Sequence, residues 1–187
     1  GVPIMPSRNI LAHAVTLAAV VLVGQFAFPQ PGHGEEDAKT TKFARIKVGD
    51  KTTFAIVEGD RVRELKGNLF RKWEKTDTTH ALSEVTLLVP TMPRHVFAMA
   101  GNYKSHLAGE EIPEKFRIPQ PFFKSPSSLL RPDGVIRIPR DDENVHYEAE
   151  LVVVIGKRAK NVPVEKALDY VFGYTCGNDV SAGTWQY

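Results

Sequence analysis

Two glutamates that could hold a metal ion, Glu148 and Glu150, stand two residues apart at the start of the strongest predicted strand, Tyr147 to Ile155. Side chains alternate between the two faces of a β-strand, so the pair would share one face. The apolar run Leu151 to Ile155 indicates a strand that is buried on both faces further along. Two carboxylates this close repel each other unless a hard cation such as Mg²⁺ or Ca²⁺ lies between them. The alternative, two ordinary surface glutamates at a solvated strand end, is the commoner case for this spacing.

Three other polar residues follow predicted strands or apolar patches, where functional groups are often displayed. Asp179 comes after the predicted strand Val171 to Thr175, and that strand can return the chain to Glu148; the alternative role for Asp179 is a helix N-cap. His106 follows another predicted strand and could act as a general base, or be a loop histidine on the surface. Lys124 follows two phenylalanines. It could anchor a substrate carboxylate or stabilise an oxyanion, or be a surface lysine whose stem covers apolar neighbours.

Short apolar and alternating segments must position these residues, and they predict a mainly β fold with few short helices. Alternation in the first segment, with turns at Gly49-Asp50 and at Glu58-Gly59-Asp60 before the next two, indicates a small β meander. Pro163 favours one short helix over Val164 to Tyr170, because proline is well tolerated in a first helical turn. The expected strands are Lys42 to Val48, Thr52 to Val57, Arg61 to Leu65, His95 to Ala100 (buried), Val135 to Ile138, Tyr147 to Ile155 and Val171 to Thr175.

The N-terminal region has the pattern of an export signal. Arg8 precedes an apolar stretch from Leu11 to Val23, which is shorter than the roughly 20 residues that a membrane span needs. Residues 1–28 are therefore expected to be a signal peptide or an uncleaved membrane anchor, with a core helix as the third possibility. Residues 29–41 combine proline, glycine and charge without apolar periodicity, and are expected to be a linker. The protein is expected to be exported, periplasmic or secreted, and membrane-bound only if the segment is an anchor.

The overall composition excludes several classes of protein. The 187 residues carry 24 basic and 22 acidic side chains, a net charge of +2, which gives no electrostatic basis for nucleic-acid binding. The single cysteine, Cys176, excludes an internal disulfide framework and a cysteine-rich zinc site.

Four segments in order resemble the signature segments of the fumarylacetoacetate hydrolase family. They are GNYKSH, PFFKSPSSL, YEAELVVVIGK and YVFGYTCGNDVSA, and the resemblance covers about Lys42 to Gln186. It implies a small N-terminal β domain over residues 42–92 and a mixed β-roll catalytic domain over residues 93–187. That second domain is expected to be incomplete, because the family's catalytic domain continues further and this chain would be truncated at its C-terminus.

The same resemblance implies roles for individual residues. A Mg²⁺ ion, or Mn²⁺ or Ca²⁺, would be held by three carboxylates. A histidine and a nearby glutamate would activate a water, and a lysine would complete the catalytic set. In this sequence the expected metal ligands are Glu148, Glu150 and Asp179, the expected catalytic residues are His106, Glu110 and Lys124, and the expected substrate contacts are Tyr103 and Gln186.

The implied activity is that of a metal-dependent hydrolase or lyase on a small 1,3-dioxo acid or related keto-dicarboxylate. A metal-bound enolate would lead to C–C bond hydrolysis, decarboxylation or isomerisation, and the full-length form would be a homodimer. Two departures from the family pattern favour an alternative, an exported non-catalytic binding module or inactive fragment. The family glutamate falls on Gly109, so Glu110 is taken as its shifted equivalent, and Gly183-Thr184 stands where the family usually has Arg-Asp.

Overall fold

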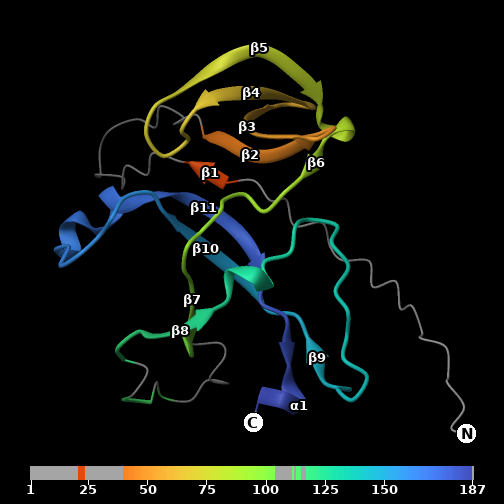
Figure 1. The fold of residues 1–187 in the computed structure, drawn as a ribbon. Coiled ribbons are helices and arrows are strands. Elements are labelled where there is room, and N and C mark those ends of the chain that lie inside the picture. The colour runs from red at the N-terminus through yellow and green to blue at the C-terminus, as the bar shows by residue number, and fades with distance from the viewer. Residues whose placement is uncertain (1–20, 24–39, 104–110, 112, 115–116, 187) are drawn as a thin grey trace, which may run out of the picture.

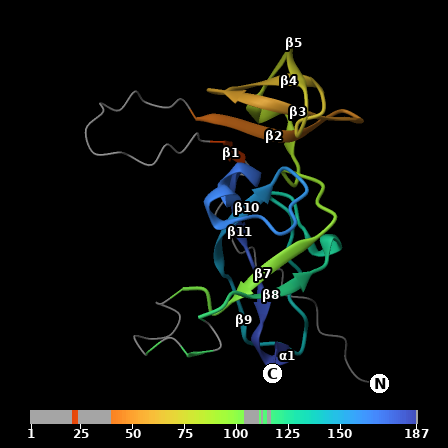
Figure 2. The same cartoon turned by 90° about the vertical axis from the view of Figure 1, so that its left-hand side faces the viewer.

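The computed structural model describes residues 21–23, 40–103, 111, 113–114 and 117–186. It confirms the mainly β fold with few short helices. One sheet of eight strands runs in the order β10-β11-β1-β2-β3-β4-β5, with β6 paired to β2, and two further sheets, β7–β8 and β9–β12, contain two strands each. Figures 1 and 2 show the β2–β5 meander at one end of the molecule, β10 and β11 in the middle, and the two small sheets with α1 at the other end.

The N-terminal half forms the predicted meander and continues it by one strand. Gly49 and Gly59 take φ of 56° and 67° in two-residue turns between the strands, a conformation that hairpins of this type need and glycine adopts without strain. The nine-residue strand β5 was not predicted. The strands are β2 (Thr41–Val48), β3 (Lys51–Glu58), β4 (Arg61–Gly67), β5 (Trp73–Ala81) and β6 (Thr86–Leu87), with the 3-10 turn η1 (Leu82–Glu84) between the last two.

The buried core lies in this meander. One cluster contains Ala44, Ile46, Ala55 and Val62, and the last three of these have no exposed surface. The other cluster contains Phe43, Ile56, Leu65 and Leu69. Phe172 from β11 packs against the second cluster, with its ring centroid 5.7 Å from that of Phe43 and 4.8 Å from that of Phe70. This aromatic contact joins the meander to the β10–β11 hairpin.

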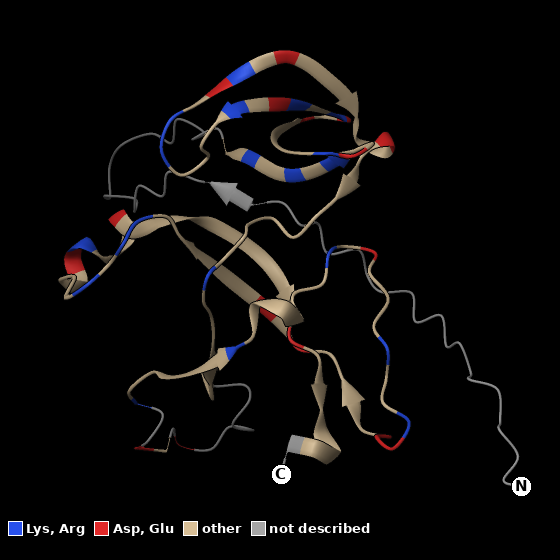
Figure 3. Cartoon of the chain, in the orientation of Figure 1, with Lys and Arg blue, Asp and Glu red and all other residues tan. Residues whose placement is uncertain are grey.

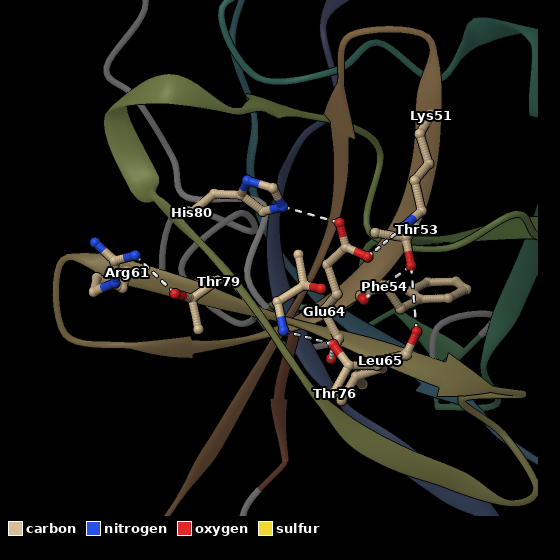
Figure 4. A network of polar contacts seen from close by, with 10 residues as sticks. Lys51, Thr53, Phe54, Arg61, Glu64, Leu65, Thr76, Thr79 and His80 are labelled. Atoms are coloured by element: carbon tan, nitrogen blue, oxygen red, sulfur yellow. Dashed lines mark hydrogen bonds and ion pairs between the residues drawn. The ribbon is translucent and has the colours of Figure 1, made fainter.

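A buried carboxylate links three strands of the meander (Figure 4). Glu64 on β4 is only 5% exposed and accepts hydrogen bonds from Lys51 on β3 and from His80 on β5, the latter over 2.9 Å. Burial raises the pKa of Glu64, but the hydrogen bonds from Lys51 and His80 more than offset this effect and hold the pKa below its ordinary value. The network therefore ties three neighbouring strands together through one ionised side chain.

The C-terminal half is built on one long antiparallel hairpin. β10 (Ala149–Ile155) pairs with β11 (Val171–Asn178), and the 3-10 helix η5 (Val164–Tyr170) connects them at the residues where a short helix was predicted. The other elements are β7 (Val96–Ala100), β8 (Gln120–Lys124), η4 (Pro126–Ser128), β9 (Val145–His146), β12 (Ser181–Ala182) and α1 (Gly183–Gln186).

Three sequence predictions about this half were wrong. Residues 135–138 form no strand, because their apolar side chains find no partner strand and are exposed. β10 is not buried on both faces, since Leu151 and Val152, which lie on opposite faces of the strand, are 59% and 37% exposed. β7 is a strand but not a buried one, as Phe97 is 55% exposed. Figure 3 shows that charged positions are frequent on β2–β5 and rare on β10–β11. The large exposed side chains of β10 are apolar, namely Leu151, Val152, Val153 and Ile155.

Only a small part of the predicted export segment is described. Val21–Val23 forms β1, which pairs with β2 on one side and with β11 on the other. Within the described residues, no helix is long and apolar enough to cross a membrane. The assignment of residues 1–28 as a signal peptide or anchor, and of residues 29–41 as a linker, stays a prediction.

Candidate active site

A cavity of about 290 Å³ opens where the ends of β8, β10 and β11 meet. Residues that are far apart in the sequence line it together, and they include two carboxylates and an ammonium group. The lining residues are Phe122, Lys124, Glu148, Asp179, Val180, Ser181 and Ala182. The structure therefore brings together Lys124, Glu148 and Asp179, three of the residues expected from the sequence.

The register of the β10–β11 hairpin places Glu148 beside Asp179. Ala149 is the Cα partner of Asn178, so the residue before β10 meets the residue after β11. The Asp179 N–H donates to the Glu148 carbonyl over 2.9 Å, and the Glu148 N–H donates to the Asn178 side-chain oxygen over 3.1 Å. These two bonds fix the backbone next to Glu148 and next to Asp179. The sequence predicted that the strand before Asp179 returns the chain to Glu148, and the hairpin does so.

Lys124 supplies the positive charge of the cavity. It ends β8, opposite Val96 of β7, and its Nζ lies 2.5 Å from Asp179 Oδ1. The Lys124 side chain is 33% exposed and that of Asp179 is 15% exposed. The ion pair is therefore partly shielded from water, where a charge interaction is stronger than on an open surface.

Two residues that the sequence interpretation missed contact the other carboxylate. The Ser181 hydroxyl donates to Glu148 Oε1 over 2.8 Å, and His146 Nε2 lies 3.2 Å from the same oxygen. His146 and Ser181 face each other in the β9–β12 ladder. The available sequence signal was their position, since each lies two residues from an expected metal ligand.

The structure changes the argument for Glu150. β10 begins at Ala149, so Glu148 lies before the strand and the alternation rule does not place it on one strand face with Glu150. Glu150 pairs with Gly177 across the hairpin, is not among the residues lining the cavity, and has an interaction of its own. In the described part of the chain no group of three or more His, Cys, Asp or Glu side chains is arranged to hold a metal ion. The role of Glu150 as a ligand stays a prediction.

The remaining expected site residues are not brought to the cavity by the described part of the chain. His106 and Glu110 lie outside the described residues. Tyr103 follows β7 and is 49% exposed. Gln186 ends α1, but its side chain lies outside the description. Their catalytic and substrate-binding roles stay predictions.

The replacement of the family's arginine by Gly183 has a local structural counterpart. The Gly183 N–H donates to the Asn144 carbonyl over 2.8 Å, which extends the contact between the β9 and β12 segments. A Cβ atom at position 183 would lie 2.3 Å from Asn144 Nδ2. A side chain here would therefore require Asn144 to move.

The groups at the cavity suit a hard divalent cation. Glu148 and Asp179 offer carboxylate oxygens, and the lining side chains contain no sulfur and no nitrogen that could bind a metal, since the Lys124 ammonium can only donate. Mg²⁺, Mn²⁺ and Ca²⁺ prefer such oxygen ligands. The ammonium of Lys124 already provides a cation for Asp179. We conclude that the residues fit a hard ion, with Glu148 and Asp179 as the two carboxylates in place.

Comparisons with known proteins match both halves of the chain. Residues 95–187 match the model described as fumarylacetoacetate (FAA) hydrolase C-terminal, and residues 41–90 match the model described as Rv2993c-like, N-terminal. Protein Rv2993c of Mycobacterium tuberculosis is 34% identical over 150 residues, which are 75% of this chain and 56% of that protein. Oxaloacetate tautomerase fahd2, mitochondrial, of Xenopus laevis is 42% identical over 105 residues, or 56% of this chain and 33% of that protein.

Comparison with solved structures also finds relatives of similar fold and sequence. The crystal structure of 5-carboxymethyl-2-hydroxymuconate delta-isomerase from Mycobacterium smegmatis has a TM-score of 0.68 at 34% identity, covering 77% of this chain and 56% of that one. Other relatives are named as a hydrolase and as a bifunctional isomerase/decarboxylase. The chain spans between about a third and somewhat more than half of the length of the relatives that it matches.

Proposed function

Because this chain belongs to the fumarylacetoacetate hydrolase family, we propose that the protein is a metal-dependent enzyme for a small keto acid, either a 1,3-dioxo acid or a keto-dicarboxylate. Enzymes of this family typically use a divalent metal ion, and named relatives include a hydrolase, a tautomerase and an isomerase/decarboxylase. The single observation that carries the proposal is the cavity that Lys124, Glu148 and Asp179 share. Two carboxylates and one ammonium in one cavity are the groups that such chemistry needs.

Glu148 and Asp179 would hold the ion, with Glu150 as the proposed third ligand. When bound, Mg²⁺ or Mn²⁺ would polarise the keto oxygen of the substrate and offset the negative charge that develops there. The two carboxylates are already fixed at their backbones by the bonds across the hairpin end. Little reorganisation of the main chain is needed for them to act together.

Lys124 would bind the anionic end of the substrate. Its ammonium pairs with Asp179 in this structure, and a substrate carboxylate or developing oxyanion in the cavity would compete for the same group. An ion bound to Asp179 would favour this exchange, because it takes over the neutralisation of that carboxylate. Phe122 lines the cavity on the same strand and adds apolar surface beside the charge.

Proton transfer is assigned to His106 with Glu110, as the sequence resemblance implies. Decarboxylation, isomerisation and C–C hydrolysis all place negative charge on the carbon chain next to a ketone. A site that stabilises this charge therefore supports all three, and the choice between them depends on residues that bind the rest of the substrate.

A non-catalytic binding module is the second candidate. The observations that favour it are Gly109 at the position of the family glutamate and Gly183 in place of the family arginine. Such a module would bind the metal ion and a keto acid without turnover.

Turnover assays separate the two candidates. Purified protein with Mg²⁺ is tested on oxaloacetate and on an acylpyruvate, following loss of the enol absorbance. We expect turnover by the unmodified protein, and a loss of about 100-fold in kcat/KM for Lys124→Met, the effect of removing one charge-stabilising donor. Lys157→Met is the matched control, because Lys157 lies over the Tyr170 ring, 5.7 Å from its centroid, and outside the cavity.

Equal kcat/KM for the two lysine variants would contradict the role of Lys124. Binding of Mg²⁺ and keto acid without turnover on either substrate would contradict the enzyme and support the binding module.

A further inference from the structure

We propose that His146 and Ser181 are positioning residues that orient the Glu148 carboxylate toward a metal ion in the cavity. The inference rests on the proposed function, because it concerns the use of Glu148 as a ligand. Neither residue was expected from the sequence, and neither has so far been given a role in the proposed reaction. The argument depends on the two contacts to one carboxylate oxygen and on the small sheet that supplies them.

The two contacts converge on the same atom. Ser181 Oγ lies 2.8 Å from Glu148 Oε1, and His146 Nε2 lies 3.2 Å from it. A carboxylate can only accept, so the hydroxyl and the Nε2–H are the donors. Within the described part of the chain, Oε2 of Glu148 has no such contact. Holding one oxygen from two directions fixes the rotation of the carboxylate and leaves the other oxygen available.

The two donor residues lie on adjacent strands of a separate two-stranded sheet, β9–β12. His146 and Ser181 are direct partners in the β9–β12 ladder, so the backbone sets the distance between them. The Gly183 N–H to Asn144 carbonyl bond continues this pairing by one more step. A flexible glutamate at a strand end loses rotamer freedom when it binds an ion, and a preformed pair of donors reduces that loss.

The surroundings of Glu148 make such support useful. The Glu148 side chain is 32% exposed, so packing alone does not hold it. Lys124, the nearby cation of the cavity, is paired with Asp179 and not with Glu148. The Ser181 hydroxyl also lies on the cavity wall, next to both expected ligands. The contacts from His146 and Ser181 are therefore the polar side-chain interactions that the described chain offers to orient this carboxylate.

Mn²⁺ affinity tests the proposal directly. Isothermal titration of the protein with Mn²⁺ alone, without substrate, compares the unmodified chain with Ser181→Ala and His146→Phe. Each change should weaken Mn²⁺ binding about 10-fold or more, the usual effect of removing a residue that orients a ligand. Ser181→Thr keeps the hydroxyl and should retain most of the affinity. Ser127→Ala is the matched control, because it removes an exposed hydroxyl contact to Ser125, outside the cavity.

The outcomes are distinguishable. If the unmodified protein binds Mn²⁺ and both variants bind it as tightly as Ser127→Ala does, the positioning role is overturned while the metal site stands. If the unmodified protein does not bind Mn²⁺, the proposed function fails and this inference fails with it. Thermal melting by circular dichroism guards against unfolding, and Ser181→Thr provides a readout that a loss of structure alone would not restore.

Discussion

Replacing Glu64 with glutamine should destabilise the meander at neutral pH. The change keeps the size of the side chain and one oxygen acceptor, but it removes the charge that Lys51 and His80 contact. Glu64 is 5% exposed, so water cannot hydrogen-bond to the side chain at this position in place of the lost contacts. One of the two partners will face an amide N–H₂ group, which cannot accept its hydrogen bond.

The magnitude follows from the exposure of the two partners. A hydrogen bond to a charged group contributes about 1.5–3 kcal/mol to stability. The Lys51 side chain is 64% exposed and regains water, so its bond is worth about 1 kcal/mol or less. The His80 side chain is 22% exposed, and its bond should carry most of the effect. We expect Glu64→Gln to lower the free energy of unfolding by about 2 kcal/mol at pH 7.

The effect should depend on pH with a defined sign. The pKa of Glu64 is held below the ordinary value of 4.5 in the folded protein, so its ionised form stabilises the fold above that pH. As the pH falls through the lowered pKa, the carboxyl group is protonated and the stabilisation is lost. The difference between Glu64→Gln and the unmodified protein is thus largest near pH 7 and shrinks below pH 4.5.

Urea unfolding at a series of pH values measures this difference. Glu74→Gln is the control, because the Glu74 side chain is 67% exposed in its pair with Lys72. A difference for Glu64→Gln that stays constant between pH 7 and pH 3, or one no larger than that of the control, would refute the reasoning.

Three further predictions concern packing and processing. Gly67→Ala should lower the free energy of unfolding by about 1–3 kcal/mol in urea melts, because Gly67 has φ of 102° and an added Cβ would lie 2.4 Å from the Lys72 carbonyl oxygen; an unchanged midpoint would contradict this. Phe172→Ala should cost about 2 kcal/mol through loss of its ring contact with Phe43, measured in the same way, and a neutral effect would show that this contact does not join the two halves. The export prediction requires a mature chain that begins between residues 25 and 36, by mass spectrometry; an intact N-terminus in a cytoplasmic fraction would contradict it and would keep β1 in the sheet.

The meander was predictable because its alternation and its turns agree. Each of its first two turns has a glycine at the position of positive φ, and apolar residues alternate with charged ones over residues 44–48 of β2. β5 was missed because residues 73–81 are mostly polar, and their strand conformation comes from pairing with β4. Residues 135–138 show the reverse case, since an apolar run without a partner strand does not form one.

The positions of the two site carboxylates were predictable from the hairpin, whereas the side-chain contacts that they make were not. Glu148 and Asp179 meet because β10 and β11 return the chain to the same end. The donors on His146 and Ser181 depend on the pairing of two strands of two residues each, which leave no periodic signal in a sequence. The ion pair between Lys124 and Asp179 likewise depends on how the β7–β8 sheet lies against the hairpin, which local patterns do not encode.

Anomalous diffraction from a crystal of the protein grown with Mn²⁺ tests the central claim most directly. The account predicts an anomalous peak in the cavity, about 2.1 Å from carboxylate oxygens of both Glu148 and Asp179, the usual ligand distance for a small hard dication. It also predicts that Lys124 Nζ moves away from Asp179 Oδ1 when the ion binds. A Mn²⁺ ion bound elsewhere, with the Lys124 to Asp179 ion pair unchanged, would contradict the account.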